Sequence, residues 1–343
     1  MSDAPTGPGG EAQEWPLPLD RDDLERAILG DIPRHTSTEV ADSAGVSLGA
    51  ARRLWRALGF PDAGEDPAFT DADLDALTLV AKLTSGDVVD FDTALRLTRA
   101  VGQTVARLAD WQVATLAERV ENVEAGDDAS GSRLLTAFQM AHEVEPTFER
   151  LLVYAWRRHL AAAVTRVEAL GAAEEELLTV NLTVGFADLV SFTRLSNGLD
   201  VGTLGFLVES FESKAADLVA GLGGRVIKTL GDSVLFVTEN ATAGVETALQ
   251  IVDAMSAEEG LPDVRVGLAT GPVVSRLGDV FGSPVNLAAR LTAVARRNRV
   301  IVDHDTALRL PRDQFEVRTL TARPLHGFGS VEPVAVRRRS PER

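Results

Sequence analysis

The sequence contains no cysteine in its 343 residues and no long apolar run. The absence of cysteine excludes disulfide frameworks, zinc–thiolate sites, iron–sulfur clusters and cysteine nucleophiles. The longest uncharged stretch in the apolar regions, 177–187, has 11 residues, whereas a membrane-spanning helix needs about 20. We therefore expect no membrane span.

Basic side chains are scarce relative to acidic ones. Lys and Arg total 34 and Asp and Glu total 51, which gives a net charge of −17. Nucleic acids and anionic membrane surfaces attract basic proteins, so this chain is a poor generic partner for either. Residues 1–14 are rich in Gly, Pro and acidic residues, unlike a secretory signal. The composition predicts a soluble, cytoplasmic protein that does not bind nucleic acid.

Helical periodicity dominates the first half of the chain, from residue 20 to about 173. Three helix starts carry capping residues, at Thr36 with Glu39, at Ser47, and at Thr70 with Asp73. Longer periodic segments are predicted near 88–108, 110–123 and 132–162. An all-α N-terminal domain is expected.

From about residue 178 the pattern alternates between strands and helices. Leu182, Val184 and Phe186 alternate with polar or small residues, as in a strand. After a helix, the apolar pairs near 226 and 235 flank a Gly-Asp turn, which predicts a hairpin. A second helix, a strand near 264–269, a third helix from about Val285 and late strands follow. This order predicts a ferredoxin-like α+β sandwich.

Two carboxylates stand where predicted strands end or turn. Asp188 lies in the stretch F-A-D-L-V-S-F-T, and Asp232 lies at the hairpin tip in L-G-D-S, four residues after Lys228. Two carboxylates with no Cys or His nearby suit a hard cation such as Mg²⁺, and two such ions would stabilise displacement at phosphorus. Either aspartate alone would be interpreted as a turn or cap residue.

A third stretch, G-D-V-F-G-S-P-V-N-L-A-A-R, contains Asp279 and opens a predicted helix. Asn286 and Arg290 lie four residues apart, so they share one face of that helix. Alone, Asn286 would be a cap and Arg290 a surface charge. The order and spacing of all three stretches together indicate a phosphate-handling site.

That combination resembles the class III nucleotidyl cyclases, the adenylyl and guanylyl cyclase family, over residues 178–336. The resemblance implies roles for six residues: Asp188 and Asp232 would hold two Mg²⁺ or Mn²⁺ ions, Lys228 and Asp279 would contact the purine edge, and Asn286 and Arg290 would orient the ribose and stabilise charge at the α-phosphate. It also implies ribose 3′-oxygen attack on the α-phosphorus with release of pyrophosphate. In the family the metal-binding and substrate-binding residues of a site come from different subunits, so we expect an obligate homodimer.

The pair Lys228 and Asp279 favours adenine over guanine. An aspartate accepts from the exocyclic amine of adenine and a lysine donates to N1, whereas guanine presents a carbonyl and an N1–H. A mismatched buried polar group costs about 1–3 kcal/mol. In the family, guanine specificity goes with a glutamate and a cysteine at these places, and this chain has no cysteine. We therefore expect ATP as the substrate, with guanylyl cyclase as the nearest enzymatic rival.

One stretch departs from the family pattern. Many relatives have a lysine in a late L-K-G stretch that touches the terminal phosphate, and here the stretch is Leu325-His326-Gly327. His326 is then either a surface residue or a triphosphate contact that is charged only at mildly acidic pH, because histidine titrates near about 6.5.

Residues 36–61 resemble the helix-turn-helix of mercury-regulator-type transcription factors, with Arg52, Arg53 and Arg56 on the second helix. Between residues 36 and 66, three Arg oppose five acidic residues, a net charge of −2. A DNA-binding surface needs a net basic footprint. We therefore interpret this segment as a helical packing module.

A helical domain before a single cyclase domain also resembles actinobacterial adenylyl cyclases whose N-terminal domain restrains catalysis and responds to pH. We expect a disordered tail at 1–15, a helical regulatory domain at 16–160, a helical linker at 161–177 and a catalytic domain at 178–343. Segment 154–176 is the expected transmission element, and His142 and His159 are candidate titrating groups.

Two other classes of function remain as alternatives. The first is a nucleotide-sensing, DNA-binding regulator with a non-catalytic cyclase-like domain, which the acidic charge disfavours. The second is a degenerate cyclase scaffold that serves as an interaction partner. That alternative predicts the loss of a metal-binding aspartate, of Asn286 or of Arg290, and all of these positions are filled.

Overall fold

A computed structural model describes residues 21–86, 89–126, 129–169, 179–258, 260–276 and 278–339. The chain divides into two units, Met1–Ala163 and Val164–Arg343, here named the helical unit and the α+β unit. The predicted tail at 1–15 lies outside the described residues, as does the predicted linker from residue 170 on. Among the described residues, no helix is both long and apolar enough to cross a membrane.

The helices of the helical unit begin where capping residues predict. Thr36 and Glu39 form a reciprocal capping box, and Thr70 and Asp73 form a second one. The Ser47 hydroxyl accepts a hydrogen bond from the Ala50 N–H. The helices are α1 (Arg21–Leu29), α2 (Ser37–Ser43), α3 (Leu48–Leu58), α4 (Asp71–Ser85), α5 (Phe91–Glu124) and α6 (Arg133–Ala169).

Helix α5 corrects one expectation, because the predicted segments 88–108 and 110–123 form a single helix. Asp110 interrupts the apolar pattern, but at an exposed position an Asp lowers helix propensity by less than about 1 kcal/mol. Gly102 lets α3 pack closely on α5, because a Cβ there would lie 2.4 Å from the carbonyl oxygen of Leu58. Nearby, the rings of Trp55 and Phe69 stack with centroids 4.3 Å apart.

The α+β unit is built on a mixed sheet in the order β2-β3-β1-β4-β6-β10-β7, with β5 paired to β4 and a separate β8–β9 hairpin. Its strands are β1 (Thr179–Leu189), β2 (Arg225–Leu230), β3 (Ser233–Thr238), β4 (Val264–Arg276), β5 (Asp279–Phe281), β6 (Arg299–Val302), β7 (Phe315–Thr319), β8 (Arg323–Leu325), β9 (Gly329–Val331) and β10 (Val334–Arg338). Its helices are α7 (Phe192–Ser196), α8 (Val201–Gly221), α9 (Ala241–Ala257), α10 (Ser283–Val294) and α11 (His304–Leu308).

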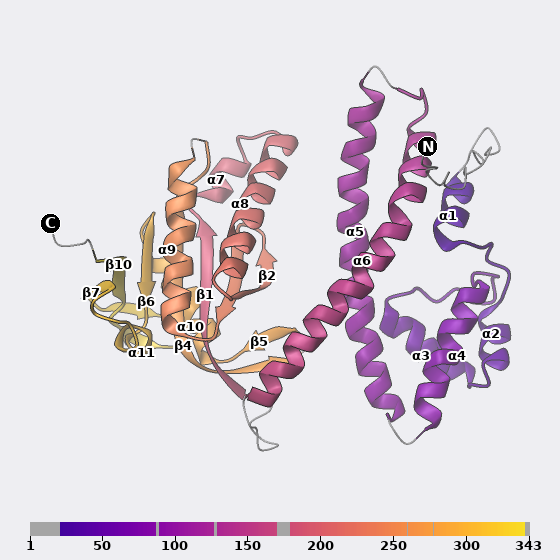
Figure 1. Ribbon diagram of the computed structural model, residues 1–343, viewed down its shortest axis with the longest axis horizontal. Coiled ribbons are helices and arrows are strands. Elements are labelled where there is room, and N and C mark those ends of the chain that lie inside the picture. Colours follow the sequence, from indigo (N-terminus) through magenta and orange to yellow (C-terminus); the bar gives the residue numbers. More distant parts are fainter. Residues whose placement is uncertain are drawn as a thin grey trace, which may run out of the picture. The chain divides into compact units, whose positions relative to one another are not determined.

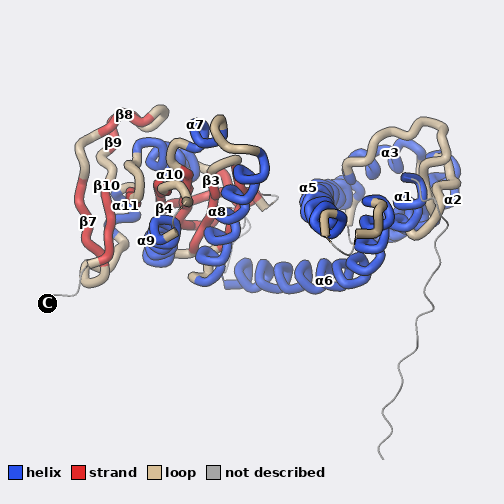
Figure 2. Tube along the Cα trace, turned by 90° about the horizontal axis from the view of Figure 1, so that it is seen from above, coloured by secondary structure: helices blue, strands red, loops and turns tan. Residues whose placement is uncertain are grey.

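Helices cover both faces of this sheet, as Figures 1 and 2 show. Ala187 and Leu189 of β1 belong to the buried cluster formed with α8 and α9, whereas Leu182 and Val184 pack on the α10 side. The order β1-α8-β2-β3-α9-β4 confirms the predicted α+β fold. Strands β5, β7, β8 and β9 were not predicted. Strands β5, β8 and β9 have three residues each, too few to show a period of two.

Candidate functional site

Asp188 lies at the end of β1 and is held by two neighbouring strands. The residues in register with it are Ser233 on β3 and Arg265 on β4. The Ser233 hydroxyl donates to Asp188 Oδ1 at 2.5 Å, and Arg265 Nε donates to Asp188 Oδ2 at 2.7 Å. The Asp188 side chain is only 12 % exposed. Sheet register therefore fixes the direction of this carboxylate.

Asp232 lies at the β2–β3 turn, beside the end of β1. The Leu189 N–H donates to the carbonyl oxygen of Asp232 at 3.0 Å, which ties the turn to β1. Burial raises the pKa of the Asp232 carboxyl, and the negative charge of Asp188 raises it further. The structure thus brings the two predicted metal-binding aspartates together.

The acid pair fits a divalent cation. Both carboxylates offer the hard oxygen ligands that Mg²⁺ and Mn²⁺ prefer. Within the described part of the chain, no group of three or more His, Cys, Asp and Glu could hold a metal by itself. A cation at Asp188 and Asp232 would need further oxygen ligands from water or phosphate, which is how Mg²⁺ is commonly bound beside nucleotides.

Lys228 and Asp279 are 51 residues apart in sequence and form an ion pair, with Lys228 Nζ 2.5 Å from Asp279 Oδ2. A β-bulge at Ile227 makes this possible. Val226 pairs with Phe236, but the next pair is Lys228 with Leu235, so Ile227 is an extra residue. The bulge turns Lys228 toward the sheet face that carries α10.

Asn286 and Arg290 lie four residues apart on α10, and both are exposed. In the described structure their side chains make no hydrogen bond or ion pair with other residues. Helix α10 begins directly after β5, which carries Asp279. Two adjoining elements therefore supply three of the predicted substrate-binding residues.

His326 lies at the turn of the β8–β9 hairpin and is exposed. The preceding residue, Leu325, is buried against Leu291 and Ile301. The hairpin is thus anchored on one side while its tip faces solvent.

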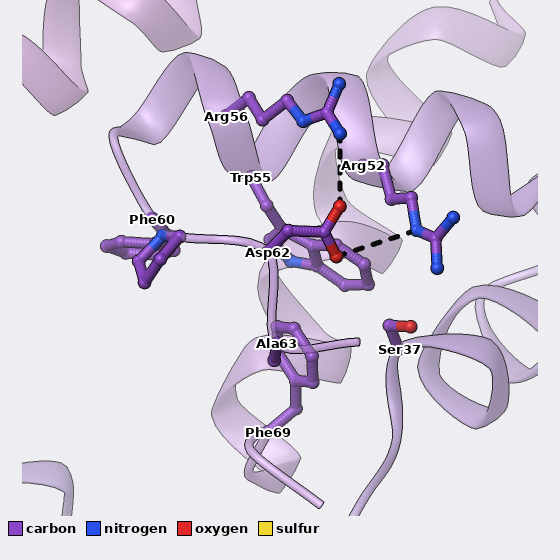
Figure 3. Close-up of a pocket in the computed structure, with 9 residues that line it drawn as sticks. Ser37, Arg52, Trp55, Arg56, Phe60, Asp62, Ala63 and Phe69 are labelled. Atoms are coloured by element: carbon purple, nitrogen blue, oxygen red, sulfur yellow. Dashed lines mark hydrogen bonds and ion pairs between the residues drawn. The ribbon is translucent and has the colours of Figure 1, made fainter. Parts of the chain in front are cut away.

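The arginines of the helix-turn-helix segment are paired with acidic residues. Figure 3 shows Asp62 between Arg52 and Arg56, with Arg56 Nη2 at 3.0 Å. Arg53 pairs with Asp92 at 3.1 Å. Guanidinium groups engaged in this way are poor phosphate contacts, which disfavours DNA binding by this face.

An apolar cavity of about 460 Å³ also lies in the helical unit. Helices α1, α3, α4 and α5 contribute to its walls, which include Leu54, Trp55, Leu77 and Val101. Its lining is mostly apolar, with Thr70, Asp73 and Thr98 as the polar residues, and does not include any of the predicted site residues.

Sequence reasoning missed Arg265 and Ser233, which hold Asp188. A signal for Arg265 was present, because it is the one charged residue in the otherwise apolar stretch V-R-V-G-L-A. Its partner could not be inferred, because the contact depends on the register between β1 and β4.

Residues 176–336 match the adenylate and guanylate cyclase catalytic domain. The chain is 40 % identical to an adenylate cyclase of Streptomyces coelicolor, over 92 % of this chain and 89 % of that protein. It is 43 % identical to an adenylate cyclase of Streptomyces griseus, over 84 % and 71 % of the two chains. A pH-sensitive adenylate cyclase of Mycobacterium tuberculosis is 29 % identical over 81 % of this chain and 70 % of its own. With such similarity along nearly its whole length, the chain belongs to the class III nucleotidyl cyclase family that its motifs predict.

Proposed function

We propose that the protein is an adenylate cyclase, which converts ATP to 3′,5′-cyclic AMP and pyrophosphate. The ion pair between Lys228 and Asp279 carries this proposal, because it places a donor beside an acceptor. Adenine N1 accepts from the lysine, and its exocyclic amine donates to the aspartate. Guanine would oppose each group with the wrong polarity. The names of the Streptomyces relatives agree with this choice of substrate.

Asp188 and Asp232 would hold the divalent cations, Mg²⁺ or Mn²⁺, two to a site. When bound, these ions neutralise triphosphate charge and lower the pKa of the ribose 3′-hydroxyl. Ser233 and Arg265 orient the Asp188 carboxylate before substrate arrives. No side chain of the chain needs to act as general base.

Arg290 and Asn286 act on the reacting centre. The bond between the ribose 3′-oxygen and the α-phosphorus forms as the bond from that phosphorus to the β-phosphate oxygen breaks. Pyrophosphate leaves, and the hydroxyl proton passes to solvent. Arg290 stabilises the charge of the pentavalent transition state with its planar guanidinium, and Asn286 orients the ribose.

Activity requires a homodimer, in which one chain supplies Asp188 and Asp232 and its partner supplies Lys228, Asp279, Asn286 and Arg290. Two identical chains related by a two-fold axis form two equivalent sites. Exposed side chains beside the site residues support such an interface, namely Leu230 on the hairpin and Phe281 on β5.

Subunit mixing tests both the chemistry and the split site. Asp188→Ala and Arg290→Ala chains should each be inactive, because each homodimer lacks one half of both sites. Mixed chains should regain about one quarter of the wild-type rate, since half of the dimers would carry one intact site. Asp188→Ala mixed with Asp232→Ala is the matched control and should stay inactive. If both mixtures were inactive, the proposal that each site is shared between two chains would be contradicted.

Substrate choice is tested with the wild-type protein. Cyclic AMP should form from ATP with Mg²⁺ or Mn²⁺, and cyclic GMP should not form from GTP. Equal turnover of the two nucleotides would contradict the role given to Lys228 and Asp279.

Regulation by the helical unit belongs to the same proposal, with a pH response as in the mycobacterial relative. The division into two units supports a separable regulator. Full-length protein and the Val164–Arg343 fragment should differ in cyclic AMP production across pH 5.5 to 8. Coincident profiles would exclude restraint by the helical unit.

His326 is proposed as a triphosphate contact, the second of the two roles that its sequence position leaves open. Its exposed position on a hairpin tip supports access to a ligand. His326→Ala should then remove part of the acid activation, and an unchanged pH profile would contradict the role.

A further inference from the structure

Arg265 uses its guanidinium in two directions. Its Nε and one terminal nitrogen, Nη2, lie 2.7 and 2.6 Å from Asp188 Oδ2. The other terminal nitrogen, Nη1, donates to the carbonyl oxygen of Ala293 at 3.2 Å. Ala293 belongs to the last turn of α10. A single side chain on β4 therefore joins the metal-binding aspartate to the end of the helix that carries Asn286 and Arg290.

The contact to Ala293 satisfies a group that α10 cannot satisfy itself. The last four carbonyl groups of a helix have no partner within it. A positive group at that end also interacts favourably with the helix dipole. Arg265 thus stabilises the final turn, which begins one residue after Arg290.

The last turn of α10 is also fixed to the sheet through Thr292. A Cβ on Gly267 would lie 2.3 Å from the Thr292 nitrogen, so helix and strand touch there. The Thr292 hydroxyl lies within 3.2 Å of the carbonyl oxygen of Phe186, to which it donates. Thr292 therefore ties the last turn of α10 to the sheet, and Arg265 holds the neighbouring carbonyl group of Ala293.

We propose that Arg265 is a positioning residue for both active sites of the dimer. In one site it orients Asp188, and in the other it holds the α10 turn that directly follows Arg290. This inference rests on the proposed function, in which a chain supplies Asp188 to one site and Arg290 to the other. An arginine suits the task because its planar fork presents donors in several directions, whereas lysine is a point charge.

Mixed dimers separate the two roles. In a dimer of an Asp188→Ala chain with an Arg290→Ala chain, the single live site takes α10 from the Asp188→Ala chain. Adding Arg265→Gln to that chain therefore affects only the α10 role. We expect kcat to fall about tenfold, less than the hundredfold that an ångström of displacement costs. The KM for ATP should stay unchanged, because Lys228 and Asp279 lie on other elements.

The matched control is Arg299→Gln, since Arg299 is the register neighbour of Arg265 on β6 and is exposed. It should leave the mixed dimer at its starting rate. Arg265→Lys in place of Arg265→Gln should not restore kcat. A rate for the Arg265→Gln dimer equal to that of the Arg299→Gln dimer would overturn the proposal.

Hydrogen exchange gives a readout that needs neither metal nor nucleotide. In full-length Arg265→Gln protein, amides of the last turn of α10 should exchange faster than in wild type and in Arg299→Gln. Unchanged exchange there would also overturn the proposal. If the parent mixture of Asp188→Ala and Arg290→Ala is inactive, the split site fails, and the exchange result alone decides the role of Arg265 at α10.

Discussion

Two carboxylates at helix starts of the helical unit contrast with two carboxylates of the α+β unit that are removed from water. In the helical unit, Glu39 and Asp71 accept hydrogen bonds at helix starts, from Thr36 and from His35 with Arg34, and their pKa values are lowered. In the α+β unit, burial raises the pKa values of Asp232 and Asp303. Glu39 secures the start of its own helix, and Asp71 ties the start of α4 to the segment before α2. In the α+β unit, Asp232 remains beside a like charge, at a cost that a cation would remove.

Asp232→Asn provides the sharpest contrast between the units. It removes a carboxylate proposed to bind the metal, so kcat for cyclic AMP formation should fall by about 10²–10³-fold, as for other lost electrostatic groups in active sites. Asp71→Asn, the matched change in the helical unit, should instead lower the thermal stability of that unit. Steady-state assays at saturating ATP measure the first effect. Wild-type turnover by Asp232→Asn would contradict the role proposed for the Asp232 carboxylate.

Close backbone packing can be tested by adding one methyl group to each unit. Gly267→Ala places a Cβ 2.3 Å from the Thr292 nitrogen, and Gly102→Ala places one 2.4 Å from the Leu58 oxygen. Overpacking of this kind costs about 1–3 kcal/mol, and backbone neighbours cannot move aside cheaply. Gly267→Ala should also lower activity, because α10 must shift.

All four tryptophans lie before residue 164, so intrinsic fluorescence follows the helical unit alone. Denaturation followed by fluorescence should therefore respond to Gly102→Ala and not to Gly267→Ala. Hydrogen exchange in the sheet should show the reverse. Identical responses in both probes would mean that the units unfold together.

Helix caps should contribute similarly in the two units. Ser47 accepts from the Ala50 N–H in one, and Asn240 accepts from the Ala243 N–H in the other. Replacement of either by alanine should cost about 1 kcal/mol. Fluorescence measures the loss of unfolding free energy in the helical unit, and hydrogen exchange in the sheet measures it in the α+β unit. A loss in only one of the two units would contradict a purely local effect of the cap.

The smallest expected effect is an opposite response to pH. The folded pKa of Asp71 lies below its ordinary 3.8, so its stabilisation is present above that value and is lost as the pH falls through the folded pKa. The folded pKa of Asp303 lies above 3.8, so its contribution is complete below 3.8 and is lost as the pH rises through the folded pKa. Asp303→Asn should make the unfolding free energy of the α+β unit less dependent on pH above about 4. If the pH dependence of stability were the same in Asp303→Asn and wild type, Asp303 would not be its source.

Local signals allowed much of this molecule to be predicted. The capping boxes at Thr36 and Thr70 and the turn at Asp232 depend on neighbours within a few residues, and the structure confirms them. Lys228 and Asp279 are 51 residues apart in sequence, so periodicity could not predict that they meet. The resemblance to the cyclase family grouped these two residues. The Arg265 contacts depend on sheet register and on where α10 ends, which no local pattern encodes.

The bulge at Ile227 has a consequence for how base specificity can change. Residues 227 and 228 both oppose Leu235, so Lys228 shares the face of α10. Inserting one residue between Lys228 and Thr229 would place the lysine opposite Phe236, on the side of α8 and α9. Asp279 would then lose its partner although both residues remained in the gene. The proposed preference for adenine therefore depends on the length of this strand as well as on the identity of its residues.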